Sequence, residues 1–274
     1  MDWIRRLHFS LIDTPWFPLW IILVVFVLVF ARYVVVAGPA YVLCWKWLRE
    51  RLQFRRIQQA FPRPGRIQRE FWWSVSTFVI FGVMGCIVFW FKRRGWTVQY
   101  EFISDYGWTY YAISLVLMVV VHDAYFYWTH RAMHHRYLFR FFHSVHHTSH
   151  NPSPWAAFSF HPLEAFVQSG ITLVLALLVP HHPSALGIFL FFMTIMNVLG
   201  HLGYELYPRG FASHPVGRWI TTSTHHNMHH HRSKGNYGIY FNWWDRWMGT
   251  LHPEYEQTYD EVTHRSRETK ASNI

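Results

Sequence analysis

Cysteine is nearly absent from this chain of 274 residues. Its two cysteines, Cys44 and Cys86, both lie inside apolar stretches. This pair matches no familiar spacing, so the sequence excludes a disulfide framework and a cysteine-based zinc site. Any metal site must therefore use other side chains.

Acidic residues are also scarce. Asp and Glu number 15 against 25 Lys and Arg, which gives a net charge of +10 at pH 7. Such an excess can indicate nucleic-acid binding, but here the basic residues share the chain with apolar runs of membrane length. Attraction to anionic lipid headgroups and control of membrane topology are the simpler explanation. We therefore expect a membrane as partner and no nucleic acid.

Long uncharged runs are abundant. Hydrophobic residues make up 51% of the chain, while the mean hydropathy of only +0.04 requires that much of the chain lies outside the membrane. About 20 apolar residues are enough to cross a bilayer as a helix. The sequence predicts an all-α integral membrane protein with about four to five transmembrane helices. The candidate spans are residues 16–31, 71–91, 106–121 (continuing to 128), 165–179 and 184–200.

The last two candidate spans are joined by the short polar turn PHHP at residues 180–183, so we expect them to form a membrane hairpin. A hairpin returns the chain to the side that it left. The histidine-rich segments 130–161 and 201–231 are therefore expected on the same side of the membrane, where they form a helical cap.

The charge of the first linker predicts which side this is. Residues 38–70 carry eight Lys or Arg against two Glu, and cytoplasmic loops are enriched in basic residues. Both histidine-rich segments are then cytoplasmic and the N-terminus is outside, although the basic KRRG at 92–95 falls on the opposite side. A re-entrant segment at 33–45 would put the N-terminus inside without moving the histidines.

Histidine is abundant and regularly spaced. The chain has 21 histidines, which include one HxxxH pattern and two HxxHH patterns. Residues at i, i+3 and i+4 share one face of a helix, and neutral imidazole is a good ligand for iron, zinc, copper and nickel. Eight imidazoles are too many for one tetrahedral ion and suit a pair of metal ions with open positions. The eight are His130, His134, His143, His146, His147, His226, His229 and His230.

The segments around these histidines resemble a known family. The chain is similar to the sterol desaturase and fatty acid hydroxylase superfamily over roughly residues 105–252, in HDAYFYWTHRAMHH, HSVHHTSHNPSPWAAFSFHPLEAF, GHLGYE and THHNMHHHRSKGNYGIYFNWWDRWMGT. The resemblance implies a membrane enzyme with two closely spaced iron ions, which uses O2 and two electrons to hydroxylate or desaturate a lipid or sterol-like substrate. It assigns the eight histidines to the metal, and it adds His161 and His201 as further candidate ligands.

The resemblance also divides the chain. We expect an N-terminal membrane region at 1–104, a catalytic domain at 105–252 and a polar C-terminal tail at 253–274. Zinc can take the place of iron in purified protein. Since no segment resembles a fused cytochrome b5-like or ferredoxin domain, electrons are expected from a separate protein of one of these types.

Other polar residues near the motifs are expected to support the ligands. The second ring nitrogen of a metal-bound histidine usually meets a carboxylate or a carbonyl. The candidate carboxylates are Asp123, Glu164, Glu205 and Asp245. The flanking histidines His135, His150, His225 and His231 are expected to support the ligands or to face solvent. His181 and His182, in the hairpin turn, are given no metal role.

Two other classes of function remain open. A membrane zinc enzyme would also use imidazole ligands, but a catalytic zinc ion normally needs three protein ligands, and eight or more histidines exceed that need. A histidine-rich metal transporter or sensor would place its ligands within the spans near the midplane, whereas these histidines follow the spans. The sequence therefore favours a lipid oxidoreductase.

Overall fold

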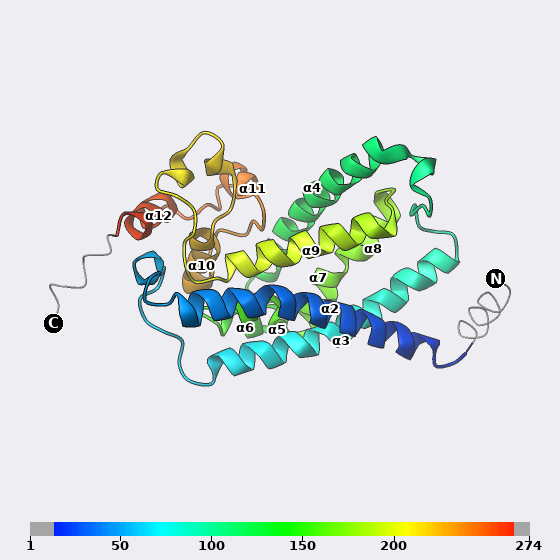
Figure 1. Cartoon of the computed structure of the whole chain (residues 1–274), viewed down its shortest axis with the longest axis horizontal. Helices are drawn as coiled ribbons and strands as arrows, with labels where there is room; N and C mark the ends of the chain where they lie inside the picture. Colours follow the sequence, from blue (N-terminus) through cyan, green and yellow to red (C-terminus); the bar gives the residue numbers. More distant parts are fainter. Residues whose placement is uncertain (1–13, 266–274) are drawn as a thin grey trace.

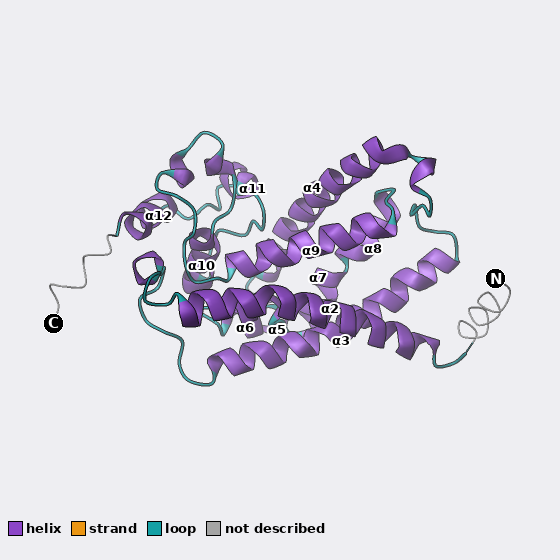
Figure 2. Ribbon diagram, viewed as in Figure 1, coloured by secondary structure: helices purple, strands orange, loops and turns teal. Residues whose placement is uncertain are grey.

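The computed structural model describes residues 14–265. Within that range two isolated β-bridges occur but no strand, and the remaining regular structure is helical. Long helices run along the molecule, and short helices and loops cover one end of them (Figures 1 and 2). The predicted all-α class is therefore confirmed.

Four helices of the described range are long and apolar enough to cross a membrane. In the most apolar stretch of each, no more than 33% of the residues are buried, so most of these side chains are at least partly exposed. Lipid tails are as apolar as leucine and can accept such a surface. The result agrees with the predicted membrane protein of four to five spans. The first span, Phe17–Trp47, consists of α2 (Phe17–Tyr41) and a π-helical turn (Val42–Trp47) that continues it. The other three spans are α3 (Arg66–Arg93), α4 (Gly107–Met133) and α9 (Pro183–Gly200).

The first span is one continuous helix. Residues 33–45 continue α2 into its π-helical turn without reversing direction. At 1.5 Å per residue a helix of 31 residues is about 46 Å long, more than the hydrocarbon core of a bilayer needs. The re-entrant alternative for this segment is therefore wrong.

The predicted span at 165–179 is shorter than the other four. It consists of α7 (Pro162–Ser169) and α8 (Ile171–Leu178), which are separated at Gly170. The Tyr125 hydroxyl donates to the Val167 carbonyl at 2.6 Å, and this carbonyl would otherwise accept a bond in a continuous helix. The PHHP turn that follows leads into α9, and Leu175 packs with Phe189 in one apolar cluster. The predicted hairpin is thus present, with one short, broken leg.

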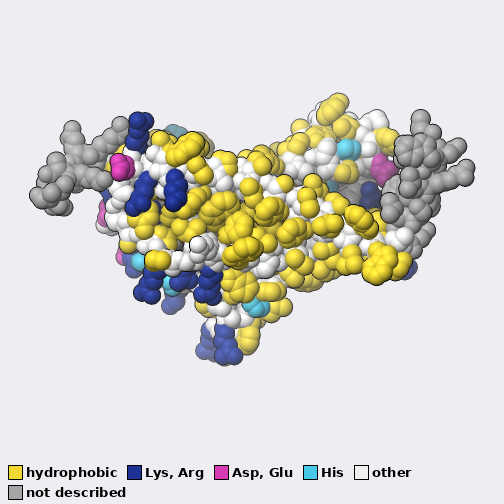
Figure 3. Space-filling model, turned by 60° about the horizontal axis from the view of Figure 1, so that its bottom comes forward, with side chains coloured by type: hydrophobic (Ala, Val, Ile, Leu, Met, Phe, Trp, Pro, Cys, Tyr) yellow, Lys and Arg dark blue, Asp and Glu magenta, His cyan; other side chains and the backbone are white. Residues whose placement is uncertain are grey.

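The basic linker between α2 and α3 lies at the same end of the bundle as the histidine motifs. The Gln58 amide donates to the His150 carbonyl and to Asn227 Oδ1, both at 2.8 Å. Arg55 donates to the Tyr207 carbonyl at 2.9 Å. On the face drawn in Figure 3, Lys and Arg side chains gather mainly toward this end, and apolar side chains cover the middle. Both histidine-rich segments therefore share one end with the basic linker, and its cytoplasmic orientation stays a prediction.

Short elements complete the structure. The cap is made of the short helices that directly follow α4 and α9, and those after α9 lie over one end of the bundle (Figure 1). The cap helices are α5 (Phe139–Phe142), α6 (Ser144–His147), α10 (Ser223–Arg232), α11 (Trp243–Trp247) and α12 (Tyr255–His264). The 3-10 turns of the described chain are Gln53–Arg55, Ile103–Asp105, Pro154–Phe158, Phe211–Ser213 and Gly217–Trp219.

The predicted division of the chain at residues 104 and 252 stays a prediction. Part of the predicted polar tail is a packed helix, because Tyr255 and Tyr259 of α12 are fully buried and cluster with Met228 of α10. Residues 266–274 of that tail, and residues 1–13 of the N-terminal region, lie outside the described residues.

Close contact between α2 and α3 depends on small residues of α3. A Cβ atom added at Gly82 would lie 2.8 Å from the Cα of Ile22. At Gly85 it would lie 3.0 Å from a methyl group of Val25. Small residues at a helix interface let two membrane helices approach closely. The α2–α3 pair therefore tolerates no larger side chain at Gly82.

We expect Gly82→Ala to destabilise the protein, because the new methyl group would meet the backbone of Ile22. Overpacking of this kind typically costs about 1–3 kcal/mol. The matched control is Gly187→Ala in α9, where an added Cβ meets nothing within 4 Å. Thermal unfolding in detergent, followed by size-exclusion chromatography, should show a lower midpoint for Gly82→Ala only. Equal midpoints would contradict this account of the α2–α3 contact.

Candidate metal centre

Nine histidines gather beneath the cap in two groups, in each of which the candidate ligand atoms lie within 4.8 Å of one another. Eight of the nine are buried, and His134 is half-buried. The first group is His130, His134, His143, His147 and His229, and the second group is His146, His201, His226 and His230.

Each HxxHH motif contributes to both groups. His143 and His147 belong to the first group, whereas His146 belongs to the second. In α10 the assignment is reversed, because His226 and His230 belong to the second group while His229 belongs to the first. Successive residues of a helix are 100° apart, so the i and i+4 imidazoles stay together and the i+3 imidazole faces the neighbouring group. The three motifs converge as predicted, but not as three separate sets.

Capping interactions hold α10 in place. The Thr222 hydroxyl accepts the backbone N–H of His225 at 3.2 Å. A carboxylate oxygen of Glu205 accepts both the N–H and the hydroxyl of Thr224, at 2.9 and 2.8 Å. A negative charge at a helix N-terminus is stabilising. The helix ends at Ser233, whose φ of 56° turns the chain back over the histidines.

The second ring nitrogen of most ligand candidates meets an acceptor. A carbonyl or a carboxylate can only accept, so each Nδ1 carries the proton and each Nε2 keeps its lone pair. The Nδ1 contacts are His130 to the Tyr237 carbonyl (2.9 Å), His143 to Glu164 Oε1 (2.6 Å), His146 to the Ser159 carbonyl (3.3 Å), His201 to the Asn197 carbonyl (2.8 Å) and His229 to the Gly235 carbonyl (2.7 Å).

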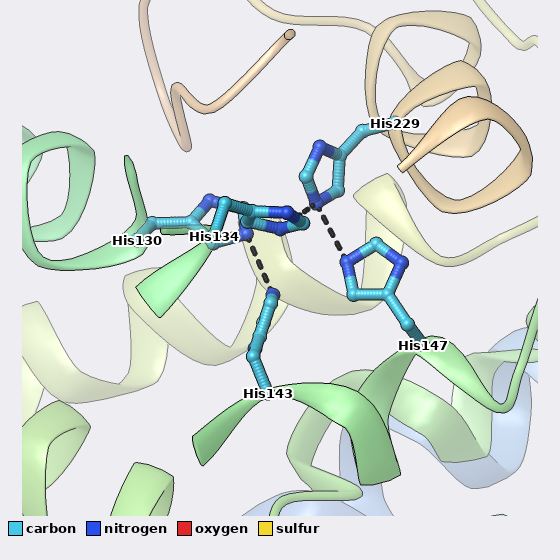
Figure 4. Close-up of side chains that lie close together, drawn as sticks. All are labelled: His130, His134, His143, His147 and His229. Atoms are coloured by element: carbon cyan, nitrogen blue, oxygen red, sulfur yellow. Dashed lines mark hydrogen bonds between the residues drawn. The ribbon is translucent and has the colours of Figure 1, made fainter. Parts of the chain in front are cut away.

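The Nε2 atoms point at one another. Figure 4 shows the first group, in which Nε2 of His130 lies 2.9 Å from Nε2 of His143, and Nε2 of His229 lies 3.0 Å from Nε2 of His147. In the second group, Nε2 of His201 lies 3.0 Å from Nε2 of His226. Two nitrogen lone pairs at such distances repel each other, whereas both are attracted to a cation that lies between them.

The spacing also suits a metal ion. Two imidazole nitrogens bound at right angles by bonds of about 2.1 Å lie about 3 Å apart. Burial also keeps these imidazoles in the neutral form that binds metals. It lowers the pKa of His201 to about 4 and that of His147 to about 3. The pKa of His229 is also well below its usual value, through burial and then the neighbouring imidazoles. The residues therefore fit a metal centre.

Of the four carboxylates predicted to support ligands, Glu164 alone has the predicted contact within the described chain. It is fully buried and lies 2.6 Å from Nδ1 of His143. Glu164 lies at the start of α7, so this helix positions a ligand of the first group. A carboxylate on a ligating histidine fixes the ring orientation and raises its basicity.

Within the described residues the other three carboxylates contact backbone groups around the site and no candidate ligand, so their supporting role stays a prediction. Glu205 caps α10, as described above. Asp123 accepts the N–H groups of Tyr240 and Phe241 at 3.0 and 3.1 Å. Asp245 accepts the N–H of Tyr237 at 2.9 Å, and the Tyr237 carbonyl in turn meets His130. Short polar side chains can reach free backbone groups at turns, which explains these roles.

The structure does not bring His161 to either group. Its Nδ1 accepts the N–H of Leu163 at 3.2 Å and caps the N-terminus of α7. His161 is therefore left out of the proposed ligand set, whereas His201 belongs to it. His225 is buried and pairs with Asp245 at 3.2 Å, and His181 lies in the turn at the opposite end of the bundle. The other flanking histidines, His135, His150 and His231, are exposed.

Sequence reasoning missed the turn that follows α10. The carbonyls of Gly235 and Tyr237 orient His229 and His130. Ser233, Gly235 and Asn236 all have positive φ values, of 56°, 75° and 56°. The sequence SKGN at residues 233–236, separated from HHNMHH by two residues, was the available signal, since Gly and Asn favour this conformation.

An apolar cavity lies one aromatic ring away from both histidine groups. Its volume is about 370 Å³, and its wall includes Phe126 and Phe160. The Phe126 ring lies 5.0 Å from the His130 ring, and the Phe160 ring lies 5.2 Å from the His146 ring, between centroids. The cavity is lined by residues of α2, α3, α4, α7, α8 and α9. An apolar molecule in this cavity would therefore be separated from the candidate metal centre by these two phenyl rings.

Comparison with known proteins supports a family assignment. The family described as Fatty acid hydroxylase matches residues 115–250, which contain all nine histidines. Delta(7)-sterol 5(6)-desaturase ERG3B of Gibberella zeae is 34% identical over 200 residues. Lathosterol oxidase of Rattus norvegicus is 30% identical over 192 residues, and Delta(7)-sterol-C5(6)-desaturase of Nicotiana tabacum is 32% identical over 172 residues.

The match to the Gibberella zeae desaturase covers 72% of this chain, the match to the Rattus norvegicus oxidase 69% and the match to the Nicotiana tabacum desaturase 60%. The chain in turn spans 60%, 62% and 59% of the length of these relatives. No solved structure matches it. The family match and the relatives agree with the histidine motifs, and this chain belongs to the sterol desaturase and fatty acid hydroxylase superfamily.

Proposed function

We propose that this protein is a di-iron membrane oxidoreductase that uses O2 and two electrons to hydroxylate or desaturate a lipid or sterol-like substrate. The observation that carries the proposal is the pair of buried histidine groups beside an apolar cavity. The relatives support a sterol-like substrate, because two are named sterol desaturases and one is named lathosterol oxidase.

The two histidine groups would each hold one iron ion. They are close neighbours, since the rings of His147 and His230 stack with centroids 5.0 Å apart. Two bound iron ions supply the redox chemistry that passes electrons to O2 and oxidises a C–H bond. Hydroxylation consumes R–H, O2, two electrons and two protons and yields R–OH and one water. Desaturation consumes the same reagents, removes two hydrogens from adjacent carbons and yields a double bond and two waters.

The protein prepares its ligands and its substrate site in advance. Backbone carbonyls and Glu164 hold the imidazole rings in place through Nδ1. Phe126 and Phe160 bring the apolar cavity up to His130 and His146, so C–H bonds of a bound lipid lie near the metal centre. The apolar wall also keeps water away from the oxidising site, which limits side reactions.

Two other functions fit the geometry less well. A zinc enzyme normally uses three protein ligands and one open position per ion, whereas the first group alone has five histidines. A transporter would place its ligands near the middle of the bilayer, whereas these groups lie at one end of the bundle, beneath the cap. The relatives named above, a sterol desaturase and a lathosterol oxidase, are enzymes. An oxidoreductase is therefore the better proposal.

The end of the bundle that carries the cap is proposed to face the cytoplasm. It holds the basic linker, whose Gln58 and Arg55 contact the histidine-rich segments. Cytoplasmic loops are enriched in Lys and Arg. The two electrons are proposed to come from a separate protein of the ferredoxin or cytochrome b5 type, which would dock on this end.

Lipid mass spectrometry tests the proposed reaction. Cells that produce the protein under air should contain a lipid that gains one oxygen, if the protein is a hydroxylase, or that loses two hydrogens, if it is a desaturase. Cells with His147→Ala should lack that product, because His147 belongs to the first group. The same lipids in both cells, with a working electron donor present, would contradict the proposal.

Metal analysis tests the proposed ligand set. We expect about two iron ions per chain in the purified protein and about one in His201→Ala, which removes a member of the second group. His161→Ala is the matched control. It should lose about 1 kcal/mol of stability with its helix cap and keep its full iron content. An equal loss of iron in both variants would contradict the ligand set.

Substitution of Glu164 tests how the first group is oriented. Glu164→Ala removes the acceptor of the His143 ring, and loss of such a partner typically weakens metal binding by about 10- to 100-fold. Glu164→Gln keeps an acceptor oxygen and should have a smaller effect. Iron retention during dialysis against a chelator gives the measurement, with the exposed Glu261→Gln as control. Equal retention in all four proteins would show that Glu164 does not act on the metal.

A further inference from the structure

Arg32 is the one charged residue of α2, and its side chain lines the apolar cavity. Within residues 14–265 the structure shows no hydrogen bond, ion pair or ring contact of its guanidinium, and Nε is buried without a partner. An ionisable residue within a membrane helix is costly and usually marks a functional site. The guanidinium therefore requires an acceptor that the described residues do not supply.

Most other polar groups of the cavity wall already have partners. Lys92 pairs with Glu101 at 3.6 Å, and Nδ1 of His122 lies 2.7 Å from the Tyr240 hydroxyl. The Asn197 amide donates to the Ala157 carbonyl at 2.6 Å. The Ser169 hydroxyl donates to the Phe166 carbonyl, and the Thr172 hydroxyl donates to the Ser169 carbonyl. Besides Arg32, Gln168 is the cavity residue whose amide has no hydrogen bond within the described chain.

Arg32 lies at the end of the cavity that is nearer the histidines. The cavity-lining residues of α2 are Ile21, Val25, Val29 and Arg32. They follow one helical face, and Arg32 is closest to the end of α2 at which the cap lies (Figure 1). Arg32 follows Ile21 by 11 positions, which correspond to about 16 Å of helix. Asn197 is the cavity-lining residue of α9 at this same end, and its carbonyl lies 2.8 Å from Nδ1 of His201.

We propose that the Arg32 guanidinium binds the polar oxygen of the lipid substrate. This proposal rests on the proposed lipid oxidoreductase function and adds a substrate-binding residue to it. Arginine only donates, so the bound group must be an acceptor, and a lipid alcohol suits a cavity that is otherwise apolar. Because Arg32 lies near the histidine end, the hydroxyl-bearing end of the lipid would approach the metal centre, and the apolar remainder would extend toward Ile21 and Lys92.

A binding experiment tests this proposal without iron or turnover. The purified protein is placed in phospholipid nanodiscs, and labelled cholestanol is displaced by unlabelled cholestanol or by cholestane, which lacks the hydroxyl. A hydrogen bond to a charged group is expected to favour the alcohol by about 10- to 100-fold. Arg32→Met should bind cholestanol as weakly as cholestane, with cholestane binding unchanged. That unchanged binding also shows that the variant has folded.

The matched control is Arg69→Met, which removes a positive charge from an exposed position of α3 outside the cavity. It should keep the full preference for the alcohol. A preference that survives in Arg32→Met, or a wild-type protein that binds both compounds equally, would overturn the role of Arg32 and leave the lipid oxidoreductase intact. Failure of the wild-type protein to bind either compound would overturn the lipid-binding function together with this inference.

Discussion

The contact between unprotonated imidazole nitrogens is the interaction on which the rest of the structure depends. Nε2 of His130 and Nε2 of His143 lie 2.9 Å apart, and such neighbours repel unless a cation lies between them. Several surrounding features hold the rings in this arrangement. Carbonyls and Glu164 bind the opposite ring nitrogens, while Asp245 anchors the turn that supplies one of those carbonyls. Burial then keeps the rings neutral, since a buried charge is costly.

The membrane helices create the conditions for this site. α4 carries His130 at its inner end, and the hairpin of α7, α8 and α9 returns the chain so that α10 can meet α6. The same helices line the cavity near the histidines. One arrangement of helices therefore supplies both the histidine groups at the end of the bundle and an apolar cavity near them.

The metal centre and the cavity draw on different parts of the chain. All nine histidines lie within residues 115–250, which match the family. The first 100 residues carry no recognisable motif, yet α2 and α3 supply Val25, Val29, Arg32 and Phe81 to the cavity wall. The histidine groups and part of the cavity wall therefore come from different segments of the chain.

The sequence by itself determined the all-α membrane class, the hairpin and eight of the nine clustered histidines. These features depend on local patterns: run length sets a span, and spacings of three and four residues set a helical face. Only the tertiary structure decided how the histidines divide between two groups. It also showed that His161 caps α7 rather than joining them, that one carboxylate of four touches a ligand, and that Arg32 lines the cavity. These outcomes depend on side chains far apart in the sequence, and local spacing carries no information about which of them meet.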